Sequence, residues 1–321
     1  MEIRIERDIF RLAEVFTISR GSRSEARVLT VHIDDGAAKG RGECLAYARY
    51  NWTEENITEQ IMGLPAAFTR EKLQSLLPAG TARNAVDAAL WDIQAKRAGK
   101  RVWELAGLAK PGPQLTAFTL SLGEPEAMQI TAAKNAHRPL LKIKLGTPDD
   151  MARLEAVRRG APNSAIIVDA NEGWSADVYS DLAPHLVRLG VKLVEQPLPA
   201  SDDEMLGEIA RPLPVCADES CQDRSSLTHL KGKYDIVNIK LDKTGGLTEA
   251  LALKKQAIDE GYGIMLGCML GSSLAMAPAV LVAQGVGFID LDGPLLLAED
   301  RDNPLQYDAA GVYPPSAALW G

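Results

Sequence analysis

The chain has 321 residues but few aromatic side chains, at 5%, and only four cysteines and four histidines. It also lacks long apolar runs, because no stretch approaches the roughly 18 consecutive apolar residues that a membrane helix needs. The N-terminal decapeptide MEIRIERDIF carries five charges and no apolar core, so it does not look like a secretory signal. With 46% apolar residues and both charge signs interspersed, the composition is that of a globular protein. We therefore expect a protein of the cytoplasm.

The chain has fewer basic than acidic residues, with 35 lysines and arginines and 43 aspartates and glutamates, which gives a net charge of -8. The chain thus has no overall basic field to attract the phosphates of nucleic acid or anionic lipid. We expect a small-molecule partner, and neither nucleic acid nor a membrane. The four cysteines form no CxxC pair or metal-finger spacing, which suits buried thiols in a reducing compartment. The oligomeric state stays open, a homo-oligomer included.

Residues 1–110 are expected to form a compact α+β domain. Alternating apolar residues predict strands over 1–9 and 27–33, and helical periodicity predicts helices over 53–62 and 84–98. The breaker sequence Lys110-Pro111-Gly112-Pro113 then marks a domain boundary. The tail at 311–321 has no helical periodicity, and we expect it to pack back onto the first domain.

The region 114–310 has a regular rhythm of short apolar segments, each ending in polar residues and followed by a helix-compatible stretch. Successive segments are 22 to 27 residues apart, as the markers show: Thr119, Lys144, Asp169, Glu195, Asp218, Lys240, Gly267 and Asp290. This spacing is that of one strand plus one crossover helix. Eight units in a row favour a parallel α/β barrel, although the rhythm alone leaves an open sheet as an alternative. The region is short for a barrel, so we expect lean connections and a missing or reshaped last helix.

Two lysines alternate in the segment LLKIKLG, which places Lys142 and Lys144 on one face of a strand. In an ordinary amphipathic strand this would be a solvated face. A barrel strand is covered by helices, however, so the two lysines are expected to point into the barrel. Mutual repulsion and partial desolvation should lower the pKa of at least one of them.

Three acidic residues end the next three segments, namely Asp169, Glu195 and Asp218. A single acid in this position is often a helix N-cap. Three carboxylates converging on one barrel mouth repel one another unless a cation lies between them, and an oxygen-only ligand set is what Mg²⁺ prefers. Histidine is absent from these positions and cysteine is limited to Cys216, which argues against zinc.

The following segment, DIVNIKL, carries Lys240, and its strand should lie roughly opposite that of Lys144. A metal flanked by two lysines on opposite sides suits removal of a proton next to a carboxylate and its return to either face. A non-enzymatic binding barrel would have no reason to combine these groups.

The strings KIK, VDAN, VEQP, ADES and NIKLDKTGG resemble signatures of the enolase superfamily, in particular of its muconate lactonizing enzyme subgroup. The resemblance covers nearly the whole chain and implies an N-terminal α+β capping domain followed by a (β/α)7β modified TIM barrel. It also implies roles for six residues, with Asp169, Glu195 and Asp218 as Mg²⁺ ligands, Lys144 and Lys240 as the acid/base pair and Lys142 at the substrate carboxylate. No histidine ends a segment, which weakens a mandelate racemase type of site.

Other residues bear on the substrate. Asp290 and Asp292 share one face at the end of the eighth segment, where they could cap a turn or hold a substrate ammonium group. This DxD resembles the motif with which dipeptide epimerases hold a free amino group. The string GSRSEA, in an arginine run that could otherwise be simply solvated, resembles epimerases that act on L-Ala-D/L-Glu. That likeness implies that Arg23 grips the glutamyl side-chain carboxylate and that Thr119 contacts the substrate.

These features together predict a Mg²⁺-dependent isomerase that interconverts L-Ala-L-Glu and L-Ala-D-Glu by two-base proton transfer, as used in murein peptide recycling. The catalytic set alone does not fix the reaction, because other members of the subgroup share it. The alternatives are o-succinylbenzoate synthesis and N-acylamino acid racemisation. Neither of those substrates carries a free ammonium group, so Asp290 and Asp292 would then lack a partner.

Overall fold

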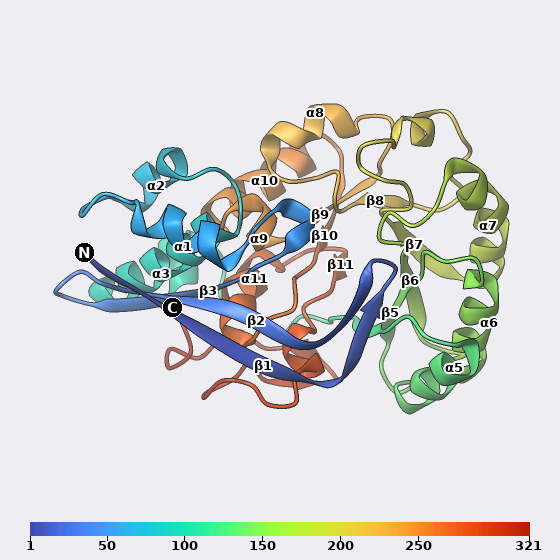
Figure 1. Ribbon diagram of the computed structural model, residues 1–321, viewed down its shortest axis with the longest axis horizontal. Helices are drawn as coiled ribbons and strands as arrows, with labels where there is room; N and C mark the ends of the chain where they lie inside the picture. The colour runs from blue at the N-terminus through green and yellow to red at the C-terminus, as the bar shows by residue number, and fades with distance from the viewer.

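A three-stranded antiparallel sheet opens the chain, and a computed structural model describes all residues, 1–321. The strands pair in the order β1-β2-β3, and the helices of this cap follow them in sequence. The elements are β1 (Glu2–Ile18), β2 (Gly21–Asp34), β3 (Lys39–Leu45), η1 (Ala48–Tyr50), α1 (Glu54–Met62), α2 (Arg70–Leu76), α3 (Thr81–Ala98) and α4 (Val102–Leu105). Figure 1 shows this cap on one side of the molecule and the barrel on the other.

Local signals explain the ends of the cap helices. The Thr53 hydroxyl accepts a hydrogen bond from Asn56 N, so α1 begins where the sequence predicts. The long helix α3 begins three residues before the predicted start and ends at Gly99, whose φ of 60° suits glycine in the left-handed region. Helix α2 was not predicted, because only Leu73 of its seven residues is buried and the apolar periodicity is correspondingly weak.

The β1–β2 hairpin is much longer than the predicted strands at 1–9 and 27–33. Its register continues from Glu2↔Asp34 to Ile18↔Gly21, with an irregularity between Arg11 and Phe16. Figure 1 shows the hairpin tip reaching across the barrel towards β5, β6 and β7. The outer part of the hairpin has no consistently buried face, so its sequence lacks the alternation that identifies a strand.

Eight parallel strands form the second sheet, in chain order from β4 to β11. They are β4 (Phe118–Leu120), β5 (Leu140–Lys144), β6 (Ala165–Asp169), β7 (Val191–Glu195), β8 (Val215–Ala217), β9 (Ile236–Ile239), β10 (Gly263–Leu266) and β11 (Phe288–Ile289). At the seam between the first and last strands, Ala117 N donates to Ile289 O at 2.8 Å. The expected parallel barrel behind an α+β cap is confirmed.

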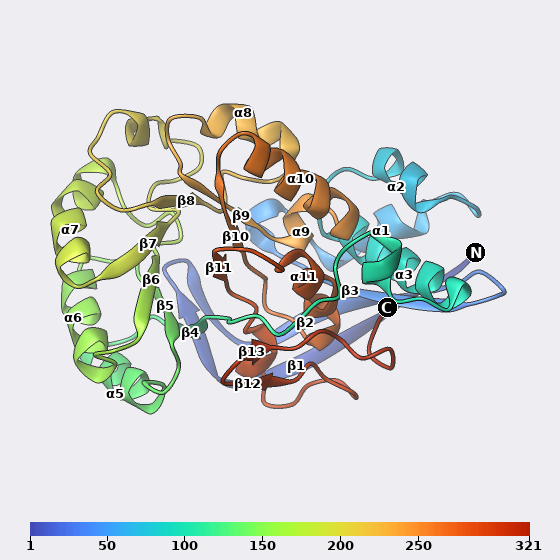
Figure 2. The same cartoon turned by 180° about the vertical axis from the view of Figure 1, so that it is seen from behind.

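The helices of the barrel lie outside its strands (Figures 1 and 2). They are α5 (Pro125–Lys134), α6 (Asp150–Gly160), α7 (Ala176–Arg188), α8 (Leu227–Leu230), α9 (Leu241–Thr244), α10 (Leu247–Asp259) and α11 (Ser273–Val282). Two crossovers are reduced to short turns, with only η2 (Glu204–Gly207) after β7, and η3 (Arg224–Ser226) with α8 after β8. Only η4 (Gly293–Leu296) follows β11, so the last helix is missing as expected.

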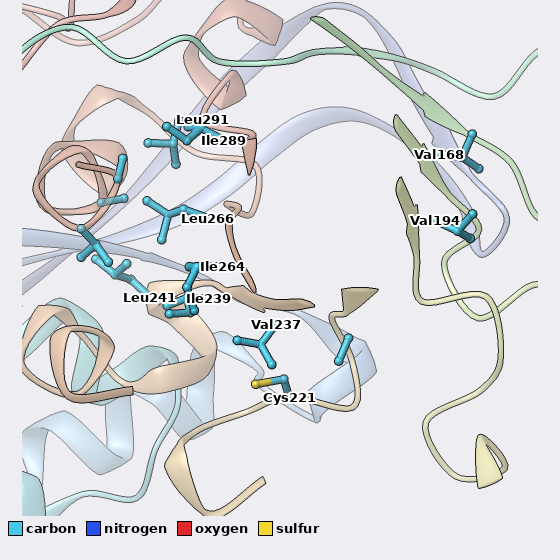
Figure 3. Packing of buried hydrophobic residues seen from close by; sticks show 14 of the residues in the cluster. Val168, Val194, Cys221, Val237, Ile239, Leu241, Ile264, Leu266, Ile289 and Leu291 are labelled. Atoms are coloured by element: carbon cyan, nitrogen blue, oxygen red, sulfur yellow. The ribbon is translucent and has the colours of Figure 1, made fainter. Parts of the chain in front are cut away.

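The barrel core has an inner and an outer layer, because side chains alternate along each strand. The inner layer is a cluster of seven buried residues from successive strands: Ala117, Leu140, Ile167, Leu193, Cys216, Ile236 and Met265. The alternate residues, such as Val168, Val194 and Val237, face the helices and belong to the large outer cluster that Figure 3 shows in part. Two residues further towards the carboxyl end, six of these seven inward positions carry a polar side chain; the seventh is Gly267.

The C-terminal tail forms the hairpin β12 (Tyr307–Asp308) and β13 (Gly311–Val312) and then runs to the cap, as Figure 2 shows from behind. There Trp320 Nε1 donates to Ala88 O at 3.0 Å, and Gly321 N donates to Asp92 Oδ1 at 2.9 Å. None of the helices combines the length and apolar character required to cross a membrane.

Candidate active site

A cavity of about 290 Å³ lies between the carboxyl ends of the barrel strands and the cap. The β1–β2 tip and the segment after β3 cover it, and both contribute charged or aromatic side chains. Its lining includes Arg20, Arg23, Tyr47 and Tyr50 from the cap, and Thr119, Lys142, Lys144, Asp218, Lys240, Asp290 and Asp292 from the barrel. The structure thus brings most of the predicted site residues to one cavity.

The three predicted metal ligands lie at the ends of neighbouring strands and are buried. Asp169 and Asp218 each contact a lysine at 2.6 Å, and Glu195 Oε2 lies 2.6 Å from Lys142 Nζ. Burial would raise the pKa of Asp169 and of Asp218, but the neighbouring lysines lower both. Because each carboxylate turns towards a lysine, no three acidic, histidine or cysteine side chains surround a common point.

The surroundings of these carboxylates nevertheless fit a hard cation. Burial and the nearby Asp169 raise the pKa of Glu195 despite Lys142, so negative charge at this carboxylate is incompletely compensated. Three further buried oxygens have no hydrogen-bond donor, namely Asn171 Oδ1, Asn238 Oδ1 and Glu219 Oε2. Oxygen-only donors with uncompensated negative charge are what Mg²⁺ binds. Binding here requires the lysine ammonium groups to give way.

Lys142 occupies the centre of the site and is only 1% exposed. Its Nζ lies 2.6 Å from Glu195, 2.7 Å from Asp290 and 3.2 Å from Asp169. Burial alone would lower the pKa of Lys142, but these carboxylates raise it well above its usual range. The expectation that at least one of the two lysines has a lowered pKa is wrong for Lys142, because attraction by three carboxylates exceeds the effect of burial.

Lys144 ends strand β5 and Lys240 directly follows strand β9. These strands are four apart in the eight-stranded sheet, so the two lysines face each other across the mouth. Lys144 Nζ lies 2.6 Å from Asp169 Oδ2, and Lys240 Nζ lies 2.6 Å from Asp218 Oδ2. Burial would lower the pKa of Lys240, but Asp218 and Glu195 raise it well above its usual range. Both side chains line the cavity, one on each side.

The two aspartates of the DxD are not equivalent. Asp290 forms an ion pair with Lys142, and its Oδ1 accepts a hydrogen bond from the Thr119 hydroxyl at 3.3 Å. Asp292 accepts from Thr119 N at 2.6 Å and has no ion pair; burial and the neighbouring Asp290 raise its pKa to about 7. Asp290 is thus already paired with a lysine ammonium group, whereas Asp292 has no ion pair, and its binding of a substrate ammonium group stays a prediction. Thr119 lines the cavity and also orients both aspartates.

The arginines of the hairpin have separate environments. Arg20 is tied to the barrel, with Nη2 2.8 Å from Glu219 Oε1 and Nη1 2.7 Å from Asn171 O. Arg27 is exposed and pairs with Glu25 on the same strand. Arg23 lines the cavity without any ion pair, and its guanidinium lies over the ring of Tyr47 with Cζ 4.9 Å from the centroid. Arg23 is therefore the arginine available to an anionic ligand.

Several site residues were missed in the sequence. Lys243 is fully buried, with Nζ 2.7 Å from Asp218 Oδ1 and 3.0 Å from Asn238 O. It lies within the string NIKLDKTGG, but its position in α9 gives no strand alternation to mark it. The two aromatic side chains over the cavity, Tyr47 and Tyr50, come from the short segment around η1, whose sequence has no recognisable pattern. The four histidines take no part in the cavity lining, as expected.

Two sequence families match this chain. Residues 1–107 match the mandelate racemase/muconate lactonizing enzyme N-terminal domain, and residues 127–315 match the enolase C-terminal domain-like family. The L-Ala-D/L-Glu epimerase of Escherichia coli is 46% identical, over 97% of this chain and 99% of its own. The N-acetyl-D-glutamate racemase of a Pseudoalteromonas species is 45% identical, over 92% of this chain and 95% of its own.

Solved structures share the fold. An enolase family member from Agrobacterium tumefaciens with homology to dipeptide epimerases, bound to sodium and L-Ala-L-Glu with an ordered loop, has a TM-score of 0.97. It is 51% identical, over 99% of each chain. A dipeptide epimerase from Enterococcus faecalis in complex with Mg and L-Leu-L-Tyr has a TM-score of 0.89 and is 26% identical, over 99% of this chain and 98% of its own.

Proposed function

The chain belongs to the mandelate racemase/muconate lactonizing enzyme family of the enolase superfamily, and from this membership we propose that it is an isomerase that interconverts L-Ala-L-Glu and L-Ala-D-Glu. The reaction moves the α-proton of the glutamyl residue. Its relatives of known activity include epimerases of this dipeptide, and a structure 51% identical to this chain binds it.

One observation carries the choice of substrate: the cavity contains an unpaired cation, Arg23, and a carboxylate without an ion pair, Asp292. A ligand that satisfies both has a carboxylate on one side and an ammonium group on the other. L-Ala-L-Glu has both, since its side-chain carboxylate suits the planar guanidinium and its amino terminus suits Asp292. The α-carboxylate then faces the cluster of lysines and acids between them.

The chemistry follows from Lys144 and Lys240 on opposite sides of the cavity. One lysine breaks the Cα–H bond by taking the proton, and the other delivers a proton to the opposite face, so that only the configuration changes. Asp169, Glu195 and Asp218 would hold Mg²⁺, which when bound withdraws electron density from the substrate carboxylate and makes the α-proton easier to remove. Two lysines are needed because a single base reaches only one face of the carbon.

A second candidate substrate is an N-acylated glutamate, because a relative at 45% identity is an N-acetyl-D-glutamate racemase. Such a substrate keeps the carboxylate for Arg23 but has an uncharged amide in place of the ammonium group. Asp292, whose pKa is raised to about 7, would then face this amide in its neutral form.

Proton exchange in D₂O distinguishes the two candidates. The enzyme is incubated with Mg²⁺ and either L-Ala-L-Glu or N-acetyl-L-Glu, and NMR follows loss of the glutamyl α-proton. We expect exchange and a second set of diastereomer signals with the dipeptide. No exchange above a metal-free control would contradict the proposal, and exchange with N-acetyl-L-Glu alone would support the second candidate.

Asp292→Asn provides a further test of the assignment. Because Asp292 lies apart from the proposed metal ligands, the variant should raise KM for L-Ala-L-Glu and leave the affinity for Mg²⁺, measured by calorimetry, unchanged. An equal loss of metal binding would show that the DxD belongs to the metal site instead.

We also propose that the protein works in the cytoplasm on small peptides released from murein. The four cysteines are all unpaired and three are buried, which suits a reducing compartment. Nothing in the net charge of -8 favours nucleic acid or an anionic membrane as a partner.

A further inference from the structure

We propose that Gln196 is a positioning residue for the Mg²⁺ site, whose side-chain amide fixes the backbone of Asp218 relative to Glu195. The inference rests on the proposed function, because that function assigns the metal to these two carboxylates. It concerns a residue that touches neither the cavity nor the ion.

Gln196 follows Glu195 directly and is fully buried. Its φ of 35° lies in the left-handed region, where a side chain other than glycine is strained, so the surrounding contacts must hold it there. The side-chain Oε1 accepts hydrogen bonds from Asp218 N at 2.9 Å and from Ser220 N at 3.1 Å. The side-chain Nε2 donates to Leu198 O at 2.9 Å and to Tyr234 OH at 2.8 Å.

The sheet alone does not hold Asp218. The register between β7 and β8 ends at Glu195↔Cys216, and Gln196 N still donates to Cys216 O at 2.8 Å. Directly after β8, the next backbone amide that points towards β7 is Asp218 N, but β7 has already ended at Glu195. The Gln196 side chain replaces the missing backbone carbonyl and so extends the hydrogen-bond ladder to the residue that carries the ligand.

A second layer of buried polar groups fixes this amide in turn. Tyr234 OH donates to Asp203 Oδ2 at 2.8 Å, and the Ser220 hydroxyl donates to the same oxygen at 2.6 Å. Lys233 Nζ donates to Asp203 Oδ1 at 2.6 Å. Because every group has a partner, the orientation of the Gln196 amide is determined, with the oxygen towards Asp218 and the nitrogen towards Tyr234.

Metal affinity is sensitive to such outer groups, because the ligands must be held in place before the ion arrives. Asp218 also receives Lys243 Nζ on its carbonyl and carboxylate, so its backbone is held from both sides. Removal of the Gln196 amide frees one side and leaves Asp218 N without an acceptor. The expected effect is weaker binding of Mg²⁺ rather than loss of the lysine bases.

The test is Gln196→Leu against the matched control Gln284→Leu. Gln284 lies at the opposite end of the barrel, where its side chain bonds Gly112 N at 3.1 Å, Gly112 O at 3.2 Å and Val280 O at 3.1 Å. Calorimetric titration with MgCl₂ should give a Kd about 10- to 100-fold weaker for Gln196→Leu. Gln284→Leu should keep the wild-type Kd within about twofold, even though both variants lose thermal stability.

An unchanged Kd in folded Gln196→Leu would overturn the inference while leaving the proposed function standing. Wild-type protein that binds no Mg²⁺ would overturn the metal assignment and this inference together. If Gln196→Leu does not fold, Tyr234→Phe replaces it, since it removes only the hydroxyl that fixes the amide. It should still weaken Mg²⁺ binding a fewfold, and a wild-type Kd in this variant would overturn the inference.

Discussion

At the scale of single residues, the site is organised by which charges are paired and which are not. Lys142 is paired with three buried carboxylates, Asp290 among them, and Arg20 is paired with Glu219. Arg23 has no ion pair although it lines the same cavity. Paired charges therefore build the site, and the unpaired ones are available to a ligand.

Replacing Arg23 should mainly affect substrate binding. A hydrogen bond to a charged group contributes about 1.5–3 kcal/mol, so Arg23→Gln should lower kcat/KM for L-Ala-L-Glu roughly 10- to 100-fold, mostly through KM. Arg27→Gln is the matched control, since Arg27 is on the same strand but exposed and paired with Glu25. Steady-state kinetics of both variants would show the difference, and equal losses would place the substrate carboxylate elsewhere.

Replacing Lys142 should mainly affect stability. Lys142→Met leaves Asp169, Glu195 and Asp290 without their shared cation, and breaking a buried ion pair in this way costs about 3–5 kcal/mol. Saturating Mg²⁺ should recover part of this loss, because it supplies positive charge to two of the same carboxylates. Urea denaturation with EDTA and with Mg²⁺ measures both quantities. An equal loss under the two conditions would contradict the shared role.

At the scale of elements, the close fit of strand β3 on helix α3 depends on glycine. A Cβ at Gly42 would lie 2.2 Å from Ala85 O, and one at Gly40 would lie 2.1 Å from Ala89 O, both far too close. The two positions alternate on one face of β3, and that face rests on the helix backbone. Both glycines lie inside the strand, where they serve close packing rather than a turn.

Gly42→Ala should therefore push β3 away from α3 and destabilise the protein by about 1–3 kcal/mol, the usual cost of overpacking. Gly112→Ala is the control, because a Cβ there meets nothing within 4 Å and the backbone is not left-handed. Thermal and urea denaturation of the two variants would show whether the close contact or the loss of glycine flexibility matters. Equal stability of both variants would exclude the packing argument.

At the scale of the whole molecule, the cap and barrel share buried carboxylates across their interface. Asp87 on α3 accepts from Thr248 N at 3.0 Å and from the Thr248 hydroxyl at 2.6 Å. Asp242 on α9 accepts from the Thr81 hydroxyl at 2.8 Å and from Asn84 Nδ2 at 3.0 Å. Burial raises the pKa of each carboxyl to about 6, although these hydrogen bonds oppose the shift. Docking of the two domains is therefore sensitive to pH.

The sign of this dependence follows from proton binding. Between about pH 4 and pH 6 the folded protein retains the proton of Asp87 while the unfolded chain has released it, so the free energy of unfolding falls as pH rises through this window. A shift of about two units corresponds to about 3 kcal/mol at neutral pH. Asp87→Asn removes the titrating carboxyl group, so the free energy of unfolding of the variant should rise relative to that of the wild type between pH 4 and pH 7. Urea denaturation at several pH values tests this, and parallel curves would contradict it.

The sequence predicted the chemistry of the site better than its pairing. Strand alternation pointed Lys142 and Lys144 into the barrel, and the ends of the repeated segments placed Asp169, Glu195 and Asp218 at its mouth. The sequence could not show that Lys142 bridges three acids, since that depends on how far neighbouring strands are offset. Gln196 and Lys243 were missed for the same reason, because their partners lie on other strands.

The sequence by itself determined the repeated strand–helix unit, the helix ends at Thr53 and Gly99 and the residue types at the strand ends. These are local properties, fixed by periodicity, capping and glycine conformation over a few residues. Only the tertiary structure decided that the β1–β2 hairpin reaches over the barrel, that Asp292 rather than Asp290 lacks an ion pair and that Arg23 rather than Arg20 is unpaired. Charge pairing between distant segments depends on distances in space, and the folded chain alone sets them.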